Sequence, residues 1–355
     1  MAKIDIIIPC YNYGNFLATS VTSILIQSIK DLRILIIDDG SSDDTLTVAK
    51  TLAQVDSRIS VVSHVENRGT IERYNEGIRW ATADYLMIFS ADDIMTPGAL
   101  ERAVAILDAH PEIVMVHGDW IDWDDSLPVP NLGEQCDYTW SRSEGLDLIH
   151  SFCEHAYNIV HAVTMIVRTP VQKMVGNYLP HLFHSGDCNI VLRFAMHGAV
   201  AHINAVQVYY RLHTTNMSSA YFTERWPDFQ QRKAAFDAFF AEYADRLPNA
   251  RQLQAQANRN MAEDAFWTAI GLICRGKGNS GRKLLRFAID LQPSLRYWPP
   301  IARLARIPDL YKKVAAAFSI RLASLLGWSV TPWDQRFKYH ATSSDEVTSQ
   351  RGGHR

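Results

Sequence analysis

Short apolar runs alternate with amphipathic segments along the first part of the chain. Five of these runs are predicted strands: Ile4–Ile8, Ile34–Ile37, Ile59–Ser63, Tyr85–Phe89 and Ile113–His117. Between them, apolar residues recur at helical spacing, as in the stripe formed by Leu17, Val21, Ile24 and Leu25. Near-continuous apolar strands separated by amphipathic helices are typical of a mostly parallel sheet that is covered on both faces. The pattern therefore predicts an α/β fold.

The pattern changes twice further along the chain. Asp122 to Glu144 carries Pro128, Pro130 and Gly133 and is predicted to be a loop. The core is then predicted to resume with a strand, a helix and a second strand, at His161–Val167, Asp187–His197 and Val200–Tyr210.

After about Arg225 only helical patterns remain. Gln252–Cys274 and Gly281–Leu291 are predicted to form a helical hairpin, which needs the main domain or a partner to cover its apolar face. The predicted organisation is an α/β domain over residues 1–224, an all-α C-terminal extension over 225–339 and a disordered tail over 340–355.

Composition and charge narrow the class of protein. The 355 residues include 35 basic and 38 acidic side chains, a net charge of −3, so nucleic acid is not an expected partner. The five cysteines are scattered without zinc-ligand spacing, and no apolar run reaches the length of a membrane span, so a cytoplasmic protein is expected. The basic amphipathic segment Tyr311–Gly327 is either a docked helix or a peripheral contact with the inner face of the membrane. The sequence does not indicate an oligomeric state.

Two adjacent carboxylates carry the most specific chemical signal. Ser90-Ala91-Asp92-Asp93 follows the predicted strand Tyr85–Phe89, at an edge where open α/β sheets bind ligands. Neighbouring carboxylates repel each other unless a cation or a donor-rich ligand neutralises them, which suggests a divalent metal carrying phosphates. The chain lacks the glycine-rich loops that cradle phosphates in other nucleotide-binding folds. The alternative is a pair of solvated aspartates that cap the next helix.

Three more loops are predicted at the same edge of the sheet. Their sequences are Pro9-Cys10-Tyr11-Asn12, Asp38-Asp39-Gly40-Ser41-Ser42-Asp43-Asp44-Thr45, and Asn67-Arg68-Gly69 leading into Arg73-Tyr74-Asn75. Together with Ser90 to Asp93, this set resembles the nucleotide-sugar half of the family-2 glycosyltransferases, which have the GT-A fold. The resemblance runs from about Lys3 to Ser218.

The resemblance implies roles for the first loops. Asp39 would accept a hydrogen bond from the N3–H of a uracil-type base, which favours a UDP-sugar and leaves a dTDP-sugar open. Pro9 and Tyr11 would shape the base pocket, and Arg68 or Arg73 would reach the base or the diphosphate. The alternative for Asp38 and Asp39 is a strand-to-turn cap, and for the two arginines an exposed place on a helix.

The resemblance also implies how the donor is held. Asp92 would bind the ribose hydroxyls and Asp93 the metal, Mn²⁺ or Mg²⁺, which bridges the diphosphate oxygens. Many family members have an acid where this chain has Ser90, so a second metal carboxylate is in doubt.

The second half of the resemblance supplies the chemistry. Asp187, at the start of a predicted helix, matches the catalytic base of an inverting enzyme; its alternative is a helix cap. Arg193 would brace this site by ion pairing. In Tyr210-Arg211-Leu212-His213, Arg211 would serve the diphosphate, and His213 would be a metal ligand or a diphosphate donor. Structural roles remain the alternative for both.

Asp119 and Trp120 lie beside the same edge in His117-Gly118-Asp119-Trp120. Indole rings stack on sugars and carboxylates bind hydroxyls, so both residues, with Asp122 and Trp123, are expected to contact a sugar; core packing under a loop is the alternative. The loop from Asp124 to Glu144 is expected to be a lid on the acceptor side.

The prediction is thus a metal-assisted inverting glycosyltransferase acting on a glycan, a lipid-linked or a protein-linked acceptor. Two alternatives are a non-catalytic glycan- or nucleotide-binding protein on the same fold and a nucleotidyltransferase. The first is disfavoured because Asp39, Asp92, Asp93 and Asp187 are all present. The second needs a phosphate-loop lysine, which the first loop lacks.

Overall fold

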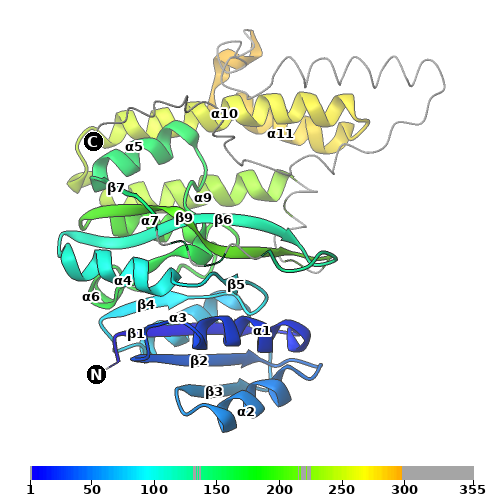
Figure 1. Ribbon diagram of the computed structural model, residues 1–355. Coiled ribbons are helices and arrows are strands. Elements are labelled where there is room, and N and C mark those ends of the chain that lie inside the picture. The colour runs from blue at the N-terminus through cyan, green and yellow to red at the C-terminus, as the bar shows by residue number, and fades with distance from the viewer. Residues whose placement is uncertain are drawn as a thin grey trace, which may run out of the picture. The chain divides into compact units, whose positions relative to one another are not determined.

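A nine-stranded mixed sheet organises the part of the chain that the computed structural model describes (Figure 1). That part is residues 2–297, apart from 131, 132, 134, 136, 215, 217–220 and 222–224. The strands are β1 (Ile4–Cys10), β2 (Leu32–Asp39), β3 (Ile59–His64), β4 (Tyr85–Ile88), β5 (Ile94–Met95), β6 (Ile113–Asp124), β7 (Trp140–Ser143), β8 (Ile166–Arg168) and β9 (Ala199–Leu212). Their order across the sheet is β3-β2-β1-β4-β8-β6-β9-β5, and β7 pairs with β9.

The first four strands in this order are all parallel, as the continuous apolar runs predicted. Alternate residues of β1 enter different clusters, because successive side chains of a strand point to opposite faces. Ile6 packs in the cluster that contains α1, and Ile7 packs in the cluster that contains α3. Both faces of this half of the sheet are therefore covered.

Helices cover the two faces unequally. Those contributing to the Ile6 side are α1 (Gly14–Leu25), α2 (Thr45–Val55) and α4 (Ala99–Ala109). Those contributing to the Ile7 side are α3 (Thr70–Trp80), α5 (Gly145–His155), α6 (Thr169–Val175), α7 (Gly186–Ala195), α9 (Arg225–Tyr243), α10 (Ala250–Cys274) and α11 (Gly278–Leu291). The C-terminal helices thus thicken one side of the sheet.

Two predictions for the middle of the chain were wrong in detail. The expected strand at His161–Val167 is a 3₁₀ turn (Ala162–Thr164) followed by the short strand β8, which pairs antiparallel with β4 and β6. The expected loop from Asp122 to Glu144 contains the end of β6 and the strand β7, which completes the sheet beside β9. The sequence analysis also missed α5, although its buried residues Leu148, Ile149, Phe152 and Cys153 recur at helical spacing, and it missed the seven-residue α6.

The helices after Arg225 share one hydrophobic core with the sheet. Phe229, Phe236 and Met261 are fully buried in the same cluster as Ile7 and Phe152. Because the core is continuous across residue 225, we propose that 225–297 is an extension fused to the α/β domain rather than a separately folding unit. The segment Tyr311–Gly327 and the tail 340–355 lie outside the described residues. None of the helices within residues 2–297 combines the length and apolar character needed to cross a bilayer.

Candidate functional site

The carboxyl ends of β1, β2 and β4 bring the predicted loops to one edge of the sheet. Cys10 pairs with Asp38 in the register of β1 and β2, and Ile7 pairs with Ile88 in the register of β1 and β4. Since these strands are parallel, the loops that follow them leave the sheet on the same side. The side chains that carry the expected chemistry then differ in what they contact.

Asp39, the last residue of β2, is held by two amides of the loop before α3 and by Arg73 of α3. Its carboxylate accepts hydrogen bonds from the backbone N–H of Arg68 and of Gly69, at 3.1 and 2.8 Å. The buried Arg73 guanidinium donates from Nε to Asp39 Oδ1 at 2.6 Å and from Nη1 to Glu76 Oε2 at 2.6 Å. Asp39 and Arg73 therefore form a buried ion pair that fixes the 67–69 loop. The Arg68 side chain is instead 68% exposed, 3.6 Å from Glu66.

The loops after β1 and β2 are tied to each other by short polar contacts. Asn12 has a positive φ of 59° and accepts a hydrogen bond from the Ser42 N–H at 2.8 Å. Asp43 accepts from the N–H of Thr45 and of Gly14, which begin α2 and α1. Asp43 thus links the first residues of the two helices, whereas Ser42 bonds to Asn12. Pro9 is half-buried and Tyr11 is exposed beside them.

Asp93 is completely buried and only half satisfied. Its Oδ1 accepts a hydrogen bond from the Arg211 N–H at 2.9 Å, while its buried Oδ2 has no hydrogen-bond partner. Burial, and secondarily the neighbouring Asp92 carboxylate, raise the pKa of Asp93 well above its usual range. A buried oxygen without a donor is costly, so this atom is suited to a ligand that arrives from outside the chain.

Asp92 lies beside His213, as the sequence predicted for a shared site. The His213 Nε2 is 2.9 Å from Asp92 Oδ2, and both side chains are nearly buried. The imidazole also packs against the Phe16 ring, with 4.7 Å between ring centroids. These contacts hold His213 against Asp92 rather than against Asp93.

Arg211 braces the same loop instead of presenting a free guanidinium. Its Nε donates to the Asp92 carbonyl oxygen at 2.6 Å, and its Nη1 pairs with Asp125. The guanidinium lies between the rings of Phe16 and Trp123, 4.8 and 4.4 Å from their centroids. In this structure Arg211 thus orders Asp92 and Asp93 from behind.

The side chains around Asp93 supply only part of the ligands that a hard divalent cation needs. Asp93 Oδ2 is an unpaired carboxylate oxygen, the type of ligand that Mg²⁺ and Mn²⁺ prefer. Within the described residues, however, three or more His, Cys, Asp or Glu side chains do not gather closely enough to hold a metal by themselves. A cation here would need further oxygens, such as those of a diphosphate.

Asp187 is the second residue of α7 and does not occupy the N-cap position of that helix. Ser185 occupies the N-cap position and makes no side-chain capping bond, so the capping alternative for Asp187 does not apply. Burial raises the pKa of Asp187 to about 6, although the Tyr178 hydroxyl and the nearby His184 oppose the rise. At neutral pH this carboxylate is mostly ionised yet able to take up a proton.

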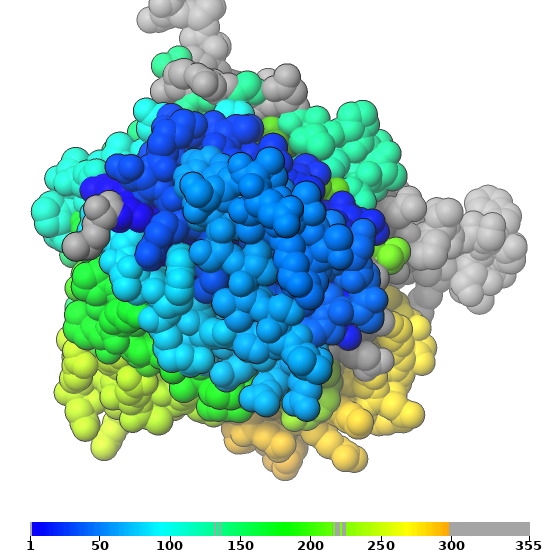
Figure 2. Space-filling model, turned by 90° about the horizontal axis from the view of Figure 1, so that it is seen from below, coloured from blue at the N-terminus to red at the C-terminus, as the bar shows by residue number. Residues whose placement is uncertain are grey.

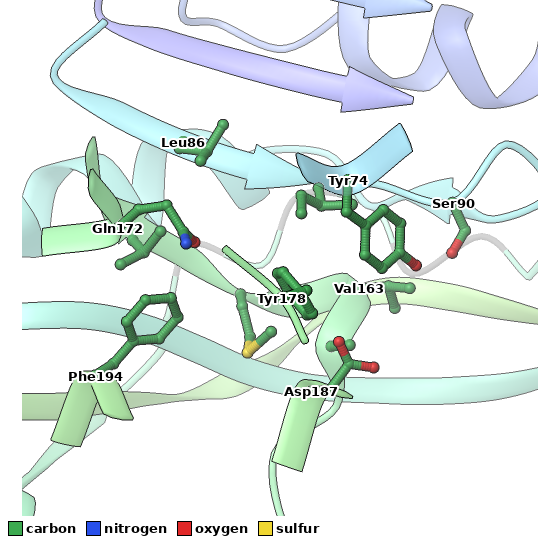
Figure 3. Close-up of a pocket in the computed structure, with 12 residues that line it drawn as sticks. Tyr74, Leu86, Ser90, Val163, Gln172, Tyr178, Asp187 and Phe194 are labelled. Carbon is green, nitrogen blue, oxygen red and sulfur yellow. The ribbon is translucent and has the colours of Figure 1, made fainter. Parts of the chain in front are cut away.

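Asp187 lines a pocket together with Ser90, which lies in the loop after β4 (Figure 3). The Asp187 carboxylate and the hydroxyls of Tyr74 and Ser90 lie toward one end, and Leu86, Gln172 and Phe194 line the other. Burial raises the pKa of Tyr74, and the carboxylates of Asp187, Asp92 and Asp93 add to this effect. Of these three acids only Asp187 lines the pocket, together with Tyr74 and with Ser90 from the loop that also carries Asp92 and Asp93.

Sequence reasoning missed the residues that position this pocket. Asn75 clamps the backbone of Tyr178 with two hydrogen bonds: its Nδ2 donates to the Tyr178 carbonyl at 2.9 Å, and its Oδ1 accepts from the Tyr178 N–H at 2.8 Å. Arg193, expected to brace Asp187, instead donates to the carbonyl oxygens of Asn177 and Val175. The arginine fixes the chain between α6 and α7, and no local pattern signals either contact.

A second unpredicted contact joins α9 to the start of α7. His184 Nε2 lies 3.2 Å from Asp228 Oδ1, and the His184 N–H donates to Gln231 Oε1 at 3.0 Å. The imidazole stacks on the Tyr221 ring, with 3.7 Å between ring centroids. Residues of the helical extension therefore support the turn that carries Asp187.

The aromatic residues after Gly118 divide between surface and core. Trp120 is 41% exposed, its indole N–H donates to Asp122 Oδ1 at 3.2 Å, and its ring lies 4.4 Å from that of His161. Trp123 is buried and donates to the carbonyl oxygens of Leu127 and Pro128, which fits the core-packing alternative. Asp119 is 3.0 Å from His202 Nε2.

Comparisons with known proteins agree with this arrangement. Residues 5–175 match the family model described as Glycosyl transferase family 2. An uncharacterized glycosyltransferase of Haemophilus influenzae is 29% identical over 224 residues, which cover 61% of this chain and 68% of that protein. The putative glycosyltransferase EpsE of Bacillus subtilis is 36% identical over 109 residues, 30% of this chain and 39% of its own length.

Two solved structures share the fold at low sequence identity. The mannosyltransferase PcManGT of Pyrobaculum calidifontis, in complex with GDP-Man and Mn²⁺, superposes with a TM-score of 0.54 at 16% identity, covering 94% of this chain and 88% of that one. TarS of S. aureus superposes with a TM-score of 0.51 at 16% identity, covering 74% and 42%.

These matches confirm the fold class and the class of enzyme that the sequence indicated. The strand-edge loops, the Asp92-Asp93 pair and the covered sheet all lie in or next to the matched segment. The chain therefore carries a glycosyltransferase domain with the GT-A fold, in which residues 5–175 match glycosyl transferase family 2.

Proposed function

We propose that the protein transfers a sugar from a nucleoside-diphosphate sugar to a hydroxyl of a glycan, a lipid-linked or a protein-linked acceptor, with inversion at the anomeric carbon. The observation that carries this proposal is the half-buried Asp187, whose carboxylate shares a pocket with Ser90 at the donor loop. The pKa of Asp187, raised to about 6 by burial, suits a general base at neutral pH.

In the proposed reaction Asp187 takes the proton of the acceptor hydroxyl. The acceptor oxygen then forms a bond to the anomeric carbon, and the bond between that carbon and the diphosphate oxygen breaks. Because attack and departure occur on opposite faces in a single displacement, the configuration inverts. Tyr178 and His184, which favour the ionised carboxylate, would hold Asp187 ready for the proton.

The donor is proposed to lie against Asp92 and Asp93. Asp93 Oδ2 is buried without a hydrogen-bond partner and would bind the cation. Asp92 would bind the ribose, with His213 next to it. Bound Mn²⁺ or Mg²⁺ would neutralise the negative charge of the leaving diphosphate. The Mn²⁺ in the PcManGT complex supports this choice of metal.

The base of the donor is proposed to sit near Asp39, Pro9 and Tyr11. Both Asp39 oxygens already accept bonds from the Arg68 and Gly69 amides and from Arg73. We therefore propose that Asp39 shapes the base pocket through the 67–69 loop and contacts the base directly only where one of these bonds opens. UDP is the first donor nucleotide to test, and dTDP and GDP follow.

The acceptor is proposed to stack on Trp120. One side of the indole lies near the His161 ring and its N–H is fixed by Asp122, so the exposed remainder forms a rigid apolar platform for a sugar. Asp119, which is half exposed, is the proposed partner of an acceptor hydroxyl.

Calorimetric titration tests the donor site directly. The protein is titrated with UDP, dTDP and GDP, each with Mn²⁺ and with EDTA. We expect one nucleotide to bind selectively and only with the metal, after which the matching sugar nucleotides are assayed for transfer and for slow hydrolysis. Absence of binding for all three nucleotides would contradict the proposed donor site and favour a non-catalytic role for the fold.

A further inference from the structure

Charge is divided very unevenly along this chain. Residues 1–224 contain 14 Lys and Arg against 27 Asp and Glu, whereas residues 225–355 contain 21 against 11. The near-neutral total of −3 therefore conceals an acidic α/β domain followed by a basic C-terminal part. Such asymmetry between the halves of a chain is typical of proteins that dock on anionic surfaces.

The basic character reaches the surface at the α10–α11 hairpin. Five exposed cations lie within twelve residues there, and we call them the basic face: Arg275, Lys277, Arg282, Lys283 and Arg286. In the described part of the chain none of the five forms an ion pair with a carboxylate. Arg282 donates to the Asn279 side chain, and Arg275 to the Gly271 carbonyl. Their charge is thus not neutralised within residues 2–297.

The three cations of α9 are paired, Arg225 among them at 3.3 Å from Asp228. Arg232 on α9 lies 3.0 Å from Asp264 and 3.6 Å from Asp228, and Lys233 contacts Asp237 one turn away. Positive charge is therefore neutralised on α9, and it is left free on the basic face. Asp290 is the one acid in the sequence of α11.

The packing of α11 turns the basic face outward. Gly281, Leu284 and Ala288 are buried on the opposite side of the helix, where α11 lies against α10. In Figure 1, α11 lies at the far end of the described chain from β3 and α2. Figure 2 views the molecule from the β3 and α2 side, where blue N-terminal residues fill the centre and the yellow C-terminal helices show only at the rim.

We propose that the basic face docks on the surface of an anionic lipid bilayer. The five cations are all exposed and lie within twelve residues of the hairpin, so they can approach one anionic surface together. The acidic α/β domain would be repelled by the same surface, which orients the sheet edge away from the lipid. A bilayer is favoured over nucleic acid because the aromatic rings of α11 and of the end of α10 are not exposed for base stacking. This inference does not depend on glycosyl transfer.

Sedimentation with lipid vesicles tests the proposal on the full chain. Vesicles of phosphatidylglycerol and phosphatidylcholine are compared with vesicles of phosphatidylcholine alone, at low and at high salt. We expect binding to the anionic vesicles only, weakened at high salt because counterions screen the attraction. Binding to both kinds of vesicle, or to neither, would overturn the proposal.

Matched charge reversals locate the binding surface. The triple variant Arg282→Glu, Lys283→Glu, Arg286→Glu should lower the partition coefficient on anionic vesicles by about 10²-fold or more. The control Lys30→Glu, Lys50→Glu, Arg79→Glu changes the net charge equally, but at exposed residues of the acidic domain, and should change binding less than about threefold.

Each remaining outcome is decisive. Equal losses in the two triple variants would assign binding to net charge, and no loss in the α11 variant would move it to residues after 297; both results would overturn the role of the basic face. Circular dichroism checks folding, and the neutral variant Arg282→Gln, Lys283→Gln, Arg286→Gln replaces the first if that one does not fold. Tighter binding to a duplex DNA or RNA oligonucleotide than to the vesicles would overturn the assignment of the partner.

Discussion

Asp39 at the end of β2 and Asp93 in the loop after β4 are both buried, but their carboxylates have opposite surroundings. Asp39 is 3% exposed and accepts bonds from two backbone amides and the Arg73 guanidinium. Asp93 is 0% exposed and leaves Oδ2 without a donor. The same residue type at the same edge of the sheet thus serves structure in one loop and retains binding capacity in the other.

The difference shows where the fold tolerates an energetic cost. An unsatisfied buried carboxylate is unfavourable, so it persists only where a ligand or a function compensates for it. Asp187 shares with Asp93 a pKa that burial raises, although the Tyr178 hydroxyl favours its ionised form. Each of the following changes tests which aspartates act on ligands and which act on the fold.

The largest effect is expected for Asp187→Asn. Because the amide cannot accept the acceptor proton, turnover should fall by about 10²-fold or more, while nucleotide binding is retained. Steady-state transfer and calorimetry measure the two quantities. The control is Asp147→Asn, an exposed acid in the first turn of α5, which should leave turnover unchanged. Near-normal turnover of Asp187→Asn would place the base elsewhere.

Asp93→Ala should next separate the metal from the base pocket. The affinity for the nucleoside diphosphate in Mn²⁺ should fall by about 10²-fold, toward the value measured with EDTA. Asp39→Asn is the comparison variant. Because it loosens the 67–69 loop, it should weaken nucleotide binding by the same factor in Mn²⁺ and in EDTA. If Asp93→Ala keeps its metal-dependent affinity, the metal assignment is wrong.

Arg73→Met tests the structural side of the comparison. Removing the guanidinium leaves the buried Asp39 without its charged partner, which should lower the free energy of unfolding by about 3 kcal/mol. Arg68→Met, in the same loop region but with an exposed side chain, should change it by less than about 0.5 kcal/mol. Urea denaturation measures both, and equal effects would contradict the role given to the Asp39–Arg73 pair.

The smallest effect is expected from pH. Turnover should fall as the pH drops below about 6, where Asp187 becomes protonated, by about tenfold per unit further down. Stability should move the other way. The pKa of Asp187 is raised above its unfolded value of about 3.9, so the folded state loses up to roughly 3 kcal/mol as the pH rises from about 4 to about 6.

Asp187→Asn should lack this loss of stability. Urea unfolding of the wild type and of the variant at pH 5 and at pH 8 checks the sign. A difference between the two proteins that is the same at both values would show that Asp187 does not titrate in this range.

The sequence was most informative where chemistry follows a strand. Asp39 and Asp93 were identifiable because each comes directly after an apolar run, and the ends of parallel strands meet at one edge. The clamp between Asn75 and Tyr178 and the contact between His184 and Asp228 were not identifiable. Each joins residues far apart in the sequence through the conformation of a loop, which no local periodicity encodes.

Contacts between residues far apart in the sequence also explain why the surroundings of Arg211 and Arg193 were not predicted. Arg211 and Arg193 were expected near the substrate and Asp187, because an arginine beside a candidate site suggests an ion pair. Arg211 lies between Phe16 and Trp123, and these rings come from α1 and β6. The role of an arginine depends on which partners surround its guanidinium, and this is known only once the elements are packed.

The contact between Asp92 and His213 spans 121 positions of the chain. During synthesis at about 5–20 residues per second, roughly 6–24 seconds separate the appearance of these two partners. During that time the nascent α/β domain carries Asp92 and Asp93 without the end of strand β9, which supplies the Arg211 N–H. The proposed donor site is therefore among the last features of the domain to form on the ribosome, and a chain interrupted before β9 cannot assemble it.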